Sequence, residues 1–300
     1  MANPVLEAAR ANKYDEFYTY YDDIEKELNN YKEFFFNSSI YCPCDTSESN
    51  FFKYFINNFK EFNLIQLCAS ALNLGITTYT GNGTIQYENN PAIYGQGDIL
   101  SDIVKKRIKQ YDVICTNPPF SLLKNFIEIL VNLNKKFIIV ANENVLINPR
   151  VFPYIMSGQC TTGINRIKSF LTDTGEERKF GNIVWLTNLP IKKEYHIFNL
   201  TKEYNPDKYP TMENYEAINV DRIQDIPKDY DGVMGVPITY LKNHNPNQFE
   251  ILGYAGGTTK TSGQNYDVPY YPHPDDRGGN AMVNGVRKFG RVFIRKIVDN

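Results

Sequence analysis

Four adjacent residues, Asn117, Pro118, Pro119 and Phe120, have the types and spacing for chemistry on a planar nitrogen. Two consecutive prolines fix the backbone and remove two donors, so the carbonyl oxygens there only accept hydrogen bonds. An exocyclic or amide nitrogen can donate its two hydrogens to the Asn117 side-chain oxygen and the Pro118 carbonyl. This draws the nitrogen toward tetrahedral geometry and aims its lone pair at an electrophile. Phe120 would stack on the planar group that carries the nitrogen, a contact worth about 1–3 kcal/mol for a base.

A structural interpretation of the same four residues stays open. Asn-Pro-Pro also forms turns that end strands, and Phe120 then packs as a core residue of the next helix. The tetrapeptide directly follows the apolar run 112–116 and precedes a helical pattern that begins at about Ser121. A motif in its strand–turn–helix context is more specific than the motif alone, so this position favours the functional interpretation.

The elements that must position this corner alternate between apolar runs and stretches with helical spacing. Strands are expected at residues 39–42, 63–69, 112–116, 136–141 and 182–188. Helical spacing of apolar residues predicts helices at 49–59 and 120–133, and a Gly-Asn-Gly centre predicts a hairpin over 76–87. The alternation predicts the α/β class: a mostly parallel sheet covered by helices, with ligands bound at the carboxyl ends of the strands.

The length of 300 residues corresponds to two domains or one large domain. After about residue 190 prolines and tyrosines become frequent, helical periodicity fades, and glycine-rich loops precede a last strand-like run at 291–297. We therefore expect an α/β domain over residues 1–190. Residues 191–300 are expected to add remaining sheet elements and an irregular, β-containing recognition region.

The composition excludes several classes of protein. Hydrophobic residues make up 42% of the chain and charged residues 22%, which is typical of a globular protein rather than a disordered scaffold. The sequence has no apolar run of about 18 residues and no apolar signal core near its start, so we expect neither a membrane span nor secretion and place the protein in the cytoplasm. A net charge of −2 gives no global attraction to nucleic acid, so any such contact must be local.

The cysteines indicate neither disulfides nor a metal site. Their number is odd, five, and Cys42, Cys68 and Cys115 lie in or at the ends of apolar runs, which is typical of reduced, packed thiols. Cys42 and Cys44 form a C-x-C rather than the C-x-x-C of a zinc site, and the three histidines are scattered. We therefore expect no metal.

The sequence NPPF at 117–120 resembles the (D/N/S)PP(Y/F/W) motif of amino-methyltransferases, which use S-adenosylmethionine. Further blocks, taken together with it, are similar to adenine-specific DNA methyltransferases of the EcoRI type: DEFYTYYDDIEKEL (15–28), IYCPCDTSESNFFKYFINNF (40–59), GDILSD (97–102), KKFIIVANENV (135–145), GNIVWLTNLP (181–190), DGVMGVPITYL (231–241) and NPNQFEILGYAGG (245–257). They cover nearly the whole chain. The resemblance implies a Rossmann-like sheet with helices on both faces that methylates N6 of an adenine flipped out of duplex DNA.

The resemblance also implies roles for the residues that match family motifs. The corner 117–120 matches the catalytic motif without change. Tyr18 and Thr19 are candidates for the methionine end of the cofactor. Asp98 would accept from the amino group of the cofactor adenine and the Ile99 amide would donate to its ring, with a plain turn after Gly97 as the alternative.

The cofactor loop departs from the family pattern. Methyltransferases generally carry a glycine loop after the first strand, whereas residues 42–52 (CPCDTSESNFF) contain no glycine. Within the resemblance, Cys42, Cys44 and Asp45 are assigned to the cofactor, with packed cysteines as the alternative. The acid that usually ends the second strand and holds the ribose is also missing from 64–70 (LIQLCAS).

Two groups of basic residues compete for the phosphates of DNA. Residues 105–109 (KKRIK) lie on a helix that leads into the 112–116 strand, so we expect them on a solvated face away from the active site. The charged residues from Asp22 to Glu27 are likewise expected on a solvated helix face. Phosphate contacts are instead expected from basic residues among the late loops: Lys260, Arg277, Arg287, Lys288 and Arg291.

These inferences predict a site-specific DNA methyltransferase that transfers a methyl group from S-adenosylmethionine to N6 of adenine, with double-stranded DNA as its partner. The resemblance also suggests a cognate restriction endonuclease, and we expect a monomer. Two alternatives stay open. One is an NPP-type methyltransferase of RNA or of protein glutamine, which uses the same acceptor geometry. The other is a DNA-binding module of the same fold without the cofactor, which the glycine-free loop leaves open.

Overall fold

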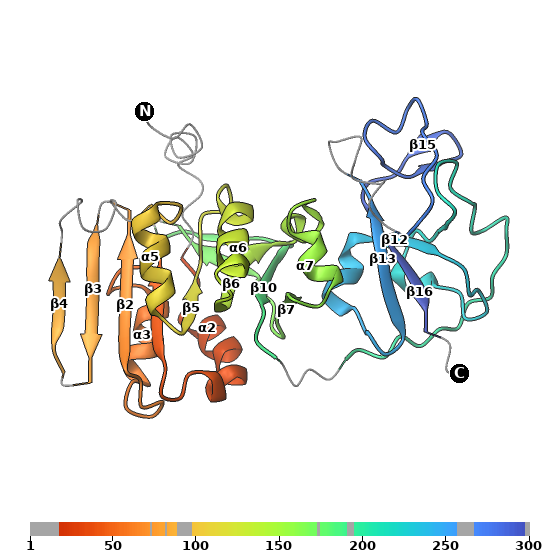
Figure 1. Ribbon diagram of the computed structural model, residues 1–300. Helices are drawn as coiled ribbons and strands as arrows, with labels where there is room; N and C mark the ends of the chain where they lie inside the picture. The colour runs from red at the N-terminus through yellow and green to blue at the C-terminus, as the bar shows by residue number, and fades with distance from the viewer. Residues whose placement is uncertain are drawn as a thin grey trace. The chain divides into compact units, whose positions relative to one another are not determined.

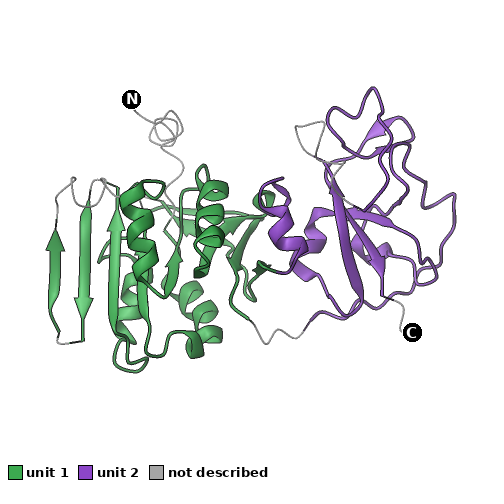
Figure 2. Ribbon diagram, in the orientation of Figure 1, with its two compact units in different colours: residues 1–145, 159–192 green, residues 146–158, 193–300 purple. Residues whose placement is uncertain are grey.

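The computed structural model describes residues 18–72, 74–81, 83–88, 98–172, 175–190, 195–256 and 267–297. The chain forms two compact units: unit 1 comprises residues 1–145 and 159–192, and unit 2 comprises residues 146–158 and 193–300 (Figure 2). The described helices are α2 (Tyr21–Leu28), η1 (Asn29–Phe34), α3 (Asn50–Asn57), α5 (Asp102–Gln110), α6 (Leu123–Asn132), η3 (Glu143–Ile147), α7 (Phe152–Met156), η4 (Ile223–Asp225) and η5 (Ile238–Asn243). The described strands are β1 (Ser39–Pro43), β2 (Gln66–Ala71), β3 (Gly75–Thr80), β4 (Ile85–Glu88), β5 (Val113–Thr116), β6 (Lys136–Asn142), β7 (Thr161–Thr162), β8 (Ser169–Leu171), β9 (Glu177–Lys179), β10 (Ile183–Thr187), β11 (Ile218–Asn219), β12 (Met234–Pro237), β13 (Phe249–Ala255), β14 (Met282–Val283), β15 (Val286–Arg287) and β16 (Arg291–Lys296).

Unit 1 is built on an eight-stranded sheet with the order β4-β3-β2-β1-β5-β6-β10-β7 (Figure 1). Its centre is parallel, because β1 pairs in parallel with both β2 and β5, and β5 with β6. The edges are antiparallel, formed by the predicted β3–β4 hairpin on one side and by β10 and β7 on the other. The predicted α/β class is therefore confirmed. Strand β2 begins at Gln66, later than predicted, because Asn63 has φ +48°, which cannot continue a strand.

Helices cover both faces of this sheet because successive side chains of a buried strand point to opposite sides. On β1, Ile40 and Cys42 join a core cluster with the buried residues of α2 and α3. Tyr41 points to the other face, where it contacts the Arg107 side chain of α5, and Figure 1 shows α5 and α6 in front of the sheet. Cys42, Cys68 and Cys115 are buried and free, so the prediction that these thiols are packed is confirmed.

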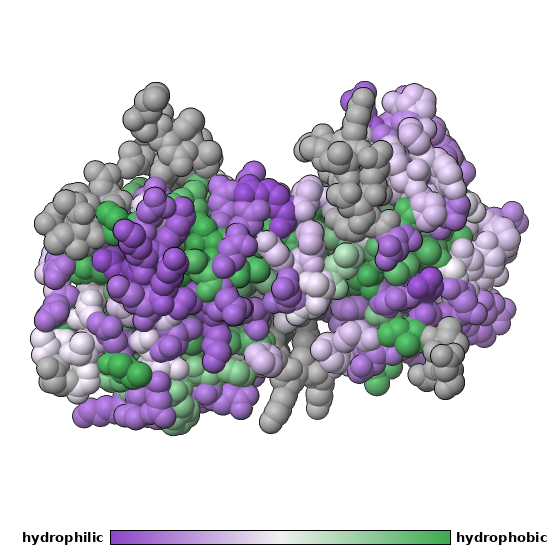
Figure 3. Space-filling view, in the orientation of Figure 1, coloured by the Kyte–Doolittle hydropathy of each residue, from purple (hydrophilic) through white to green (hydrophobic). Residues whose placement is uncertain are grey.

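The basic helix α5 is largely solvated, as predicted. Figure 3 shows hydrophilic surface over it, and Lys106 and Lys109 are exposed. Arg107 differs, since it is half-buried and its guanidinium reaches the hydroxyl group of Tyr41. Over the described residues, no helix has the length and apolar character needed to cross a lipid bilayer.

The prediction that Glu27 lies on a solvated face is wrong. Glu27 is fully buried, because it shares the inward face of α2 with Ile24 and Leu28. Its carboxylate accepts hydrogen bonds from the backbone amides of Ile164 (2.9 Å) and Asn165 (2.7 Å), from the Asn165 side chain (2.8 Å) and from a tyrosine hydroxyl. A buried carboxylate is tolerated only with such partners, so Glu27 anchors α2 to the segment after β7.

Unit 2 contains the predicted β structure. Its four-stranded sheet has the order β11-β12-β16-β13, and its last strand, Arg291–Lys296, matches the run predicted at 291–297. A separate hairpin, β14–β15, turns at Asn284 (φ +51°) and Gly285 (φ +70°), the left-handed pair of a tight hairpin turn. The segment 146–158, which contains α7, belongs to this unit, although no feature of the sequence indicated that. The separate function expected for each unit stays a prediction.

Candidate active site

The candidate site lies at the end of the central strand β1, which has β2 on one side and β5 on the other. From β1 the chain continues to its neighbour β2, and the strand on its other side is β5. Ligands of open α/β sheets bind at such a switch point, outside the carboxyl ends of the strands. The two segments that leave these ends are the loop after Pro43 and the corner 117–120 after Thr116.

Thr116 joins these two segments. Its hydroxyl lies within hydrogen-bonding distance of the Pro43 carbonyl and 2.7 Å from Oδ2 of Asp45. Asp45 is also held by its backbone amide, which donates to the Ser70 carbonyl at the end of β2 (3.2 Å). The loop after β1 and the corner after β5 are therefore held together by buried polar contacts.

Asp45 is nearly fully buried beneath this junction. Burial raises the pKa of its carboxyl to about 7, although hydrogen bonds from Thr116 and Ser49 act in the opposite direction. The Thr116 hydroxyl has one proton and two acceptors within reach. A protonated Asp45 can donate to this hydroxyl while the hydroxyl donates to Pro43, so the neutral carboxyl satisfies the junction best.

The corner itself is short and rigid. Pro118 is buried, whereas Asn117 and Phe120 are half-buried. The Pro119 carbonyl accepts the Leu122 amide (3.0 Å), and α6 begins at Leu123, slightly later than predicted. The Pro118 carbonyl makes no hydrogen bond to another described residue, so it is available as an acceptor. Phe120 packs partly against the unit 1 core, so the structural interpretation applies to one side of its ring.

The cofactor loop compensates for its missing glycine through Cys44. Cys44 has φ +68°, the left-handed conformation that glycine usually provides. The following helix α3 is capped by Ser49, whose side chain accepts the Phe52 amide at 3.2 Å. Cys42 is fully buried in the core, and burial raises the pKa of its thiol. Its side chain packs in the core, as the alternative expected, and a contact of Cys42 with the cofactor stays a prediction.

Thr19 contacts the start of α3, although the two are far apart in the sequence. The Asn50 side chain donates to the Thr19 carbonyl (2.8 Å), and Tyr18 pairs with Leu171 through two backbone hydrogen bonds. The Thr19 side chain is buried, yet its hydroxyl has no hydrogen-bond partner among the described residues. Such a group costs about 1–3 kcal/mol. A buried hydroxyl without a partner, on a segment that contacts the start of α3, fits a site that binds a polar cofactor.

The other predicted cofactor residues lie before α5. Asp98 Oδ1 accepts the Leu100 amide (2.9 Å), which forms a local turn. The Ile99 side chain is buried, and its backbone amide makes no hydrogen bond to another described residue. Gly97 lies outside the described residues, and no hydrogen bond between described residues joins Asp98 to the corner. The role of Asp98 and Ile99 therefore stays a prediction.

The late basic residues of unit 2 fall into two groups. Arg277 and Arg287 are exposed and make no ion pair with a described residue, whereas Lys260 lies outside the described residues. Lys288 pairs with Asp221 at 3.2 Å. Arg291 is buried, which changes its expected role.

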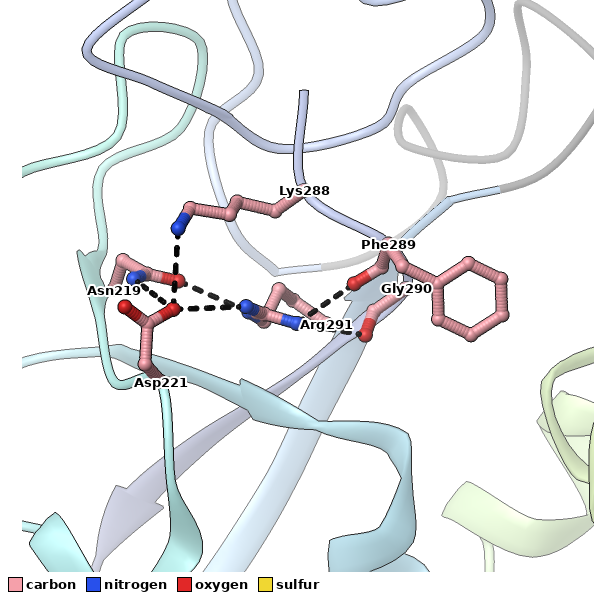
Figure 4. A network of polar contacts seen from close by, with 6 residues as sticks. All are labelled: Asn219, Asp221, Lys288, Phe289, Gly290 and Arg291. Carbon is pink, nitrogen blue, oxygen red and sulfur yellow. Dashed lines mark hydrogen bonds and ion pairs between the residues drawn. The ribbon is translucent and has the colours of Figure 1, made fainter. Parts of the chain in front are cut away.

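Figure 4 shows the partners of Arg291. Its guanidinium donates to Asn219 Oδ1 (2.9 Å), to Asp221 Oδ1 (3.1 Å) and to the Phe289 carbonyl (2.7 Å). A hydrogen bond from Asn219, together with the nearby charges of Lys288 and Arg291, lowers the pKa of Asp221. With its donors used in this way, Arg291 supports the local backbone rather than offering a free cation to a phosphate.

Sequence reasoning missed Thr116, Asn50 and Glu27. Thr116 carried a usable signal, because it is the one hydroxyl-bearing residue in β5 and directly precedes the corner. Asn50 carried none, since its partner Thr19 is 31 residues away.

The chain is similar in sequence to known proteins over nearly its whole length. The family described as "Adenine-specific methyltransferase EcoRI" matches residues 5–94 and 75–297. The type II methyltransferase M.EcoRI of Escherichia coli is 35% identical, over 90% of this chain and 95% of its own length. Type II methyltransferases of Mycoplasma genitalium (M.MgeORF184P, 32% identical) and Mycoplasma pneumoniae (M.MpnI, 29% identical) each align with 96% of the chain and 97% of their own length. No solved structure matches the chain.

The matches cover the corner 117–120, the loop after β1 and the late strands, and the resemblance predicted from the quoted blocks is confirmed. The chain therefore belongs to the EcoRI family of adenine-specific methyltransferases, which are DNA methyltransferases.

Proposed function

We propose that the protein transfers a methyl group from S-adenosylmethionine to N6 of a flipped adenine within a specific sequence of duplex DNA. The observation that carries the proposal is the position of Asn117 to Phe120 directly after β5, at the switch point and linked through Thr116 to the loop after β1. The description of the family supports adenine as the target, and the type II names of its relatives support DNA as the substrate.

The corner acts by orienting the target amine. The Asn117 side-chain oxygen and the Pro118 carbonyl accept the two amine hydrogens, and the exposed part of Phe120 stacks on the base. The bound cofactor supplies a methyl group on a positively charged sulfur. The proton of the amine becomes acidic only after the new bond has formed, so no general base is needed beforehand. The catalytic effect is therefore mainly positioning.

Residues around the loop after β1 suit the cofactor. The unpartnered Thr19 hydroxyl and the start of α3 offer polar contacts to its methionine end, with Tyr18 and Cys44 alongside. Asp45 acts through Thr116 as a positioning residue rather than by direct contact. Asp98 and the Ile99 amide are proposed for the adenine end.

DNA binding is assigned to unit 2. Arg277 and Arg287 are exposed cations suited to phosphate, and Lys288, which directly follows Arg287, pairs with Asp221. Flipping the adenine costs a few kcal/mol, which these contacts and the corner together offset. A restriction endonuclease that cleaves the same unmethylated sequence is the partner expected for a type II enzyme, and the enzyme is proposed to act as a monomer.

The proposal is tested by changing the corner. Asn117→Ala removes one of the two acceptors, so turnover should fall by about 100- to 1000-fold while DNA binding changes little. The readout is N6-methyladenine, quantified in digests of DNA incubated with purified protein and S-adenosylmethionine.

Asn132→Ala is the matched control, because Asn132 is exposed at the far end of α6. Near-normal methylation by Asn117→Ala would contradict the role of the corner. Methylation of another base would leave the corner intact but move the target away from adenine.

The two alternatives differ in measurable ways. The glycine-free loop favours a module without cofactor, whereas the left-handed Cys44 favours binding. Calorimetry with S-adenosylmethionine decides between them, since the module gives no heat of binding. A methyltransferase of RNA or protein glutamine would label RNA or protein in preference to duplex DNA when all three are offered with labelled cofactor.

A further inference from the structure

Phe289 is the most exposed phenylalanine among the described residues of unit 2, with 71% of its surface accessible. It lies between the β14–β15 hairpin and β16. Burying a phenylalanine stabilises a fold by about 1.5–3 kcal/mol, and this ring does not contribute that. Figure 4 shows the ring directed away from the polar network around Arg291. Folding of unit 2 therefore does not explain its position.

The backbone that carries this ring is held firmly. Arg291, itself fixed by Asn219 and Asp221, donates to the Phe289 carbonyl. The adjacent Gly290 is packed so closely that a Cβ atom there would lie 2.9 Å from Ile238. Before the ring, the Lys288 amide donates to the Ala281 carbonyl (2.8 Å). The ring is thus presented on a rigid support rather than on a free loop.

The hairpin beside the ring is fixed in the same way. The Gly285 amide at its tip donates to the Glu213 carboxylate (2.6 Å), and the Met282 amide donates to the Asn214 side chain (2.9 Å). A rigid support lowers the entropy cost of binding, because the contacting side chain is already in place.

The charged residues next to this ring along the chain are positive. Arg287, Lys288 and Arg291 lie within two residues of Phe289, and one carboxylate, Asp221, pairs with two of them. The Arg287 side chain is exposed and makes no ion pair with a described residue. An exposed aromatic ring beside cations suits a polyanion with flat apolar faces. Duplex DNA has both features, since phosphates border stacked bases.

We propose that Phe289 is an aromatic wedge that enters the base stack of the bound duplex while Arg287 contacts an adjacent phosphate. The inference rests on the DNA methyltransferase function proposed above and names a contact that unit 2 makes with its DNA. Apolar side chains inserted at a base step unstack and kink the duplex, and they repay that cost through additional contacts. Such a wedge would lower the cost of opening the duplex for an enzyme that flips a base.

The first test is binding of fluorescently labelled short duplexes to purified full-length protein. One duplex carries the sequence found methylated in DNA from cells that express the protein, and a second has random sequence. Phe289→Ala should weaken binding of the first by about tenfold, equivalent to about 1.4 kcal/mol. Phe289→Leu, which keeps an apolar wedge, should retain most of the affinity.

Val286→Ala is the matched control, since Val286 is 59% exposed in the same hairpin. Thermal unfolding should be unchanged in all three variants because their side chains are exposed. Equal affinity of Phe289→Ala and wild type for both duplexes overturns the wedge.

A second test places a reporter at the ring. The chain has a single tryptophan, Trp185, which is fully buried, so Phe289→Trp adds the one exposed indole. Duplex DNA should quench its emission strongly by stacking, whereas Val286→Trp should respond weakly. Equal quenching at both positions overturns the wedge.

Failure of this inference and of the proposed function give different results. A wild-type protein that methylates DNA, together with an unaffected Phe289→Ala variant, disproves the wedge alone. Stacking at position 289 without methylation by the wild type supports the wedge and disproves the proposed enzyme. Light scattering tests whether the ring instead contacts a second copy of the chain. A dimer that Phe289→Ala dissociates, with DNA binding unchanged, would assign the ring to that contact and overturn the wedge.

Discussion

Replacing Asp45 with asparagine tests the buried junction between the loop after β1 and the corner 117–120. Burial raises the Asp45 pKa from 3.8 to about 7. Between these values the unfolded chain ionises Asp45 while the folded protein keeps the proton, so stability falls as the pH rises through this window. The loss is complete above about pH 7. At about 1.4 kcal/mol per pKa unit, a shift of about 3 units corresponds to about 4 kcal/mol.

Asparagine reproduces the neutral form. Its side-chain amide can donate to the Thr116 hydroxyl, as a protonated Asp45 does, and it carries no charge at any pH. The variant should therefore lack this pH dependence. We expect Asp45→Asn and wild type to differ little at about pH 4, and the variant to be more stable by up to about 4 kcal/mol at about pH 8.

The assay is urea unfolding followed by Trp185 fluorescence. This residue is the one tryptophan in the chain and lies buried in unit 1, so its emission reports that unit. Free energies of unfolding from linear extrapolation are compared at several pH values between about 4 and about 9. Taking the difference between variant and wild type removes the titration of other groups.

Asp22→Asn removes the same charge from an exposed position on α2 and should show no such trend. Parallel stability curves for Asp45→Asn and wild type over the whole pH range would refute a neutral Asp45. A variant that loses stability with rising pH faster than wild type would reverse the sign of the argument.

Two further predictions concern buried polar groups of unit 1. Thr19→Val removes the unpartnered hydroxyl, so the ligand-free protein should gain about 1 kcal/mol of stability. Calorimetry should show that S-adenosylmethionine binds this variant several-fold more weakly than wild type. Unchanged affinity would exclude a contact between Thr19 and the cofactor. Glu27→Gln places an amino group or a neutral oxygen against the amides of Ile164 and Asn165, so the free energy of unfolding should fall by about 2–3 kcal/mol. The control Glu25→Gln, at an exposed position, should change it little. Equal urea midpoints for Glu27→Gln and wild type would show that the charge of Glu27 is not needed.

The local pattern of the sequence determined most of unit 1. Apolar runs followed by helical spacing predicted β1, β5, β6 and β10 closely, because a strand buried on both faces needs a continuous apolar run. The corner at 117–120 was found for the same reason: a motif of four adjacent residues keeps its local geometry wherever the strand lies.

Contacts between distant segments were not predictable in this way. Glutamate is usually solvated, and only the packing of α2 against the segment 163–165 makes Glu27 a buried acceptor. The sequence predicts Arg291 as a cation that contacts phosphate. In the structure Asn219 and Asp221, about 70 residues earlier, accept hydrogen bonds from its guanidinium.

The sequence by itself therefore determined the α/β class and the family, and it predicted the corner at 117–120 as the catalytic motif. Tertiary structure decided which polar residues are buried, which are partnered and which remain available: Thr116 with Asp45, the unpartnered Thr19 hydroxyl and the exposed ring of Phe289. The physical reason is that hydrophobic periodicity is set by neighbours along the chain, whereas the energy of a polar group depends on which distant groups and how much water surround it after folding.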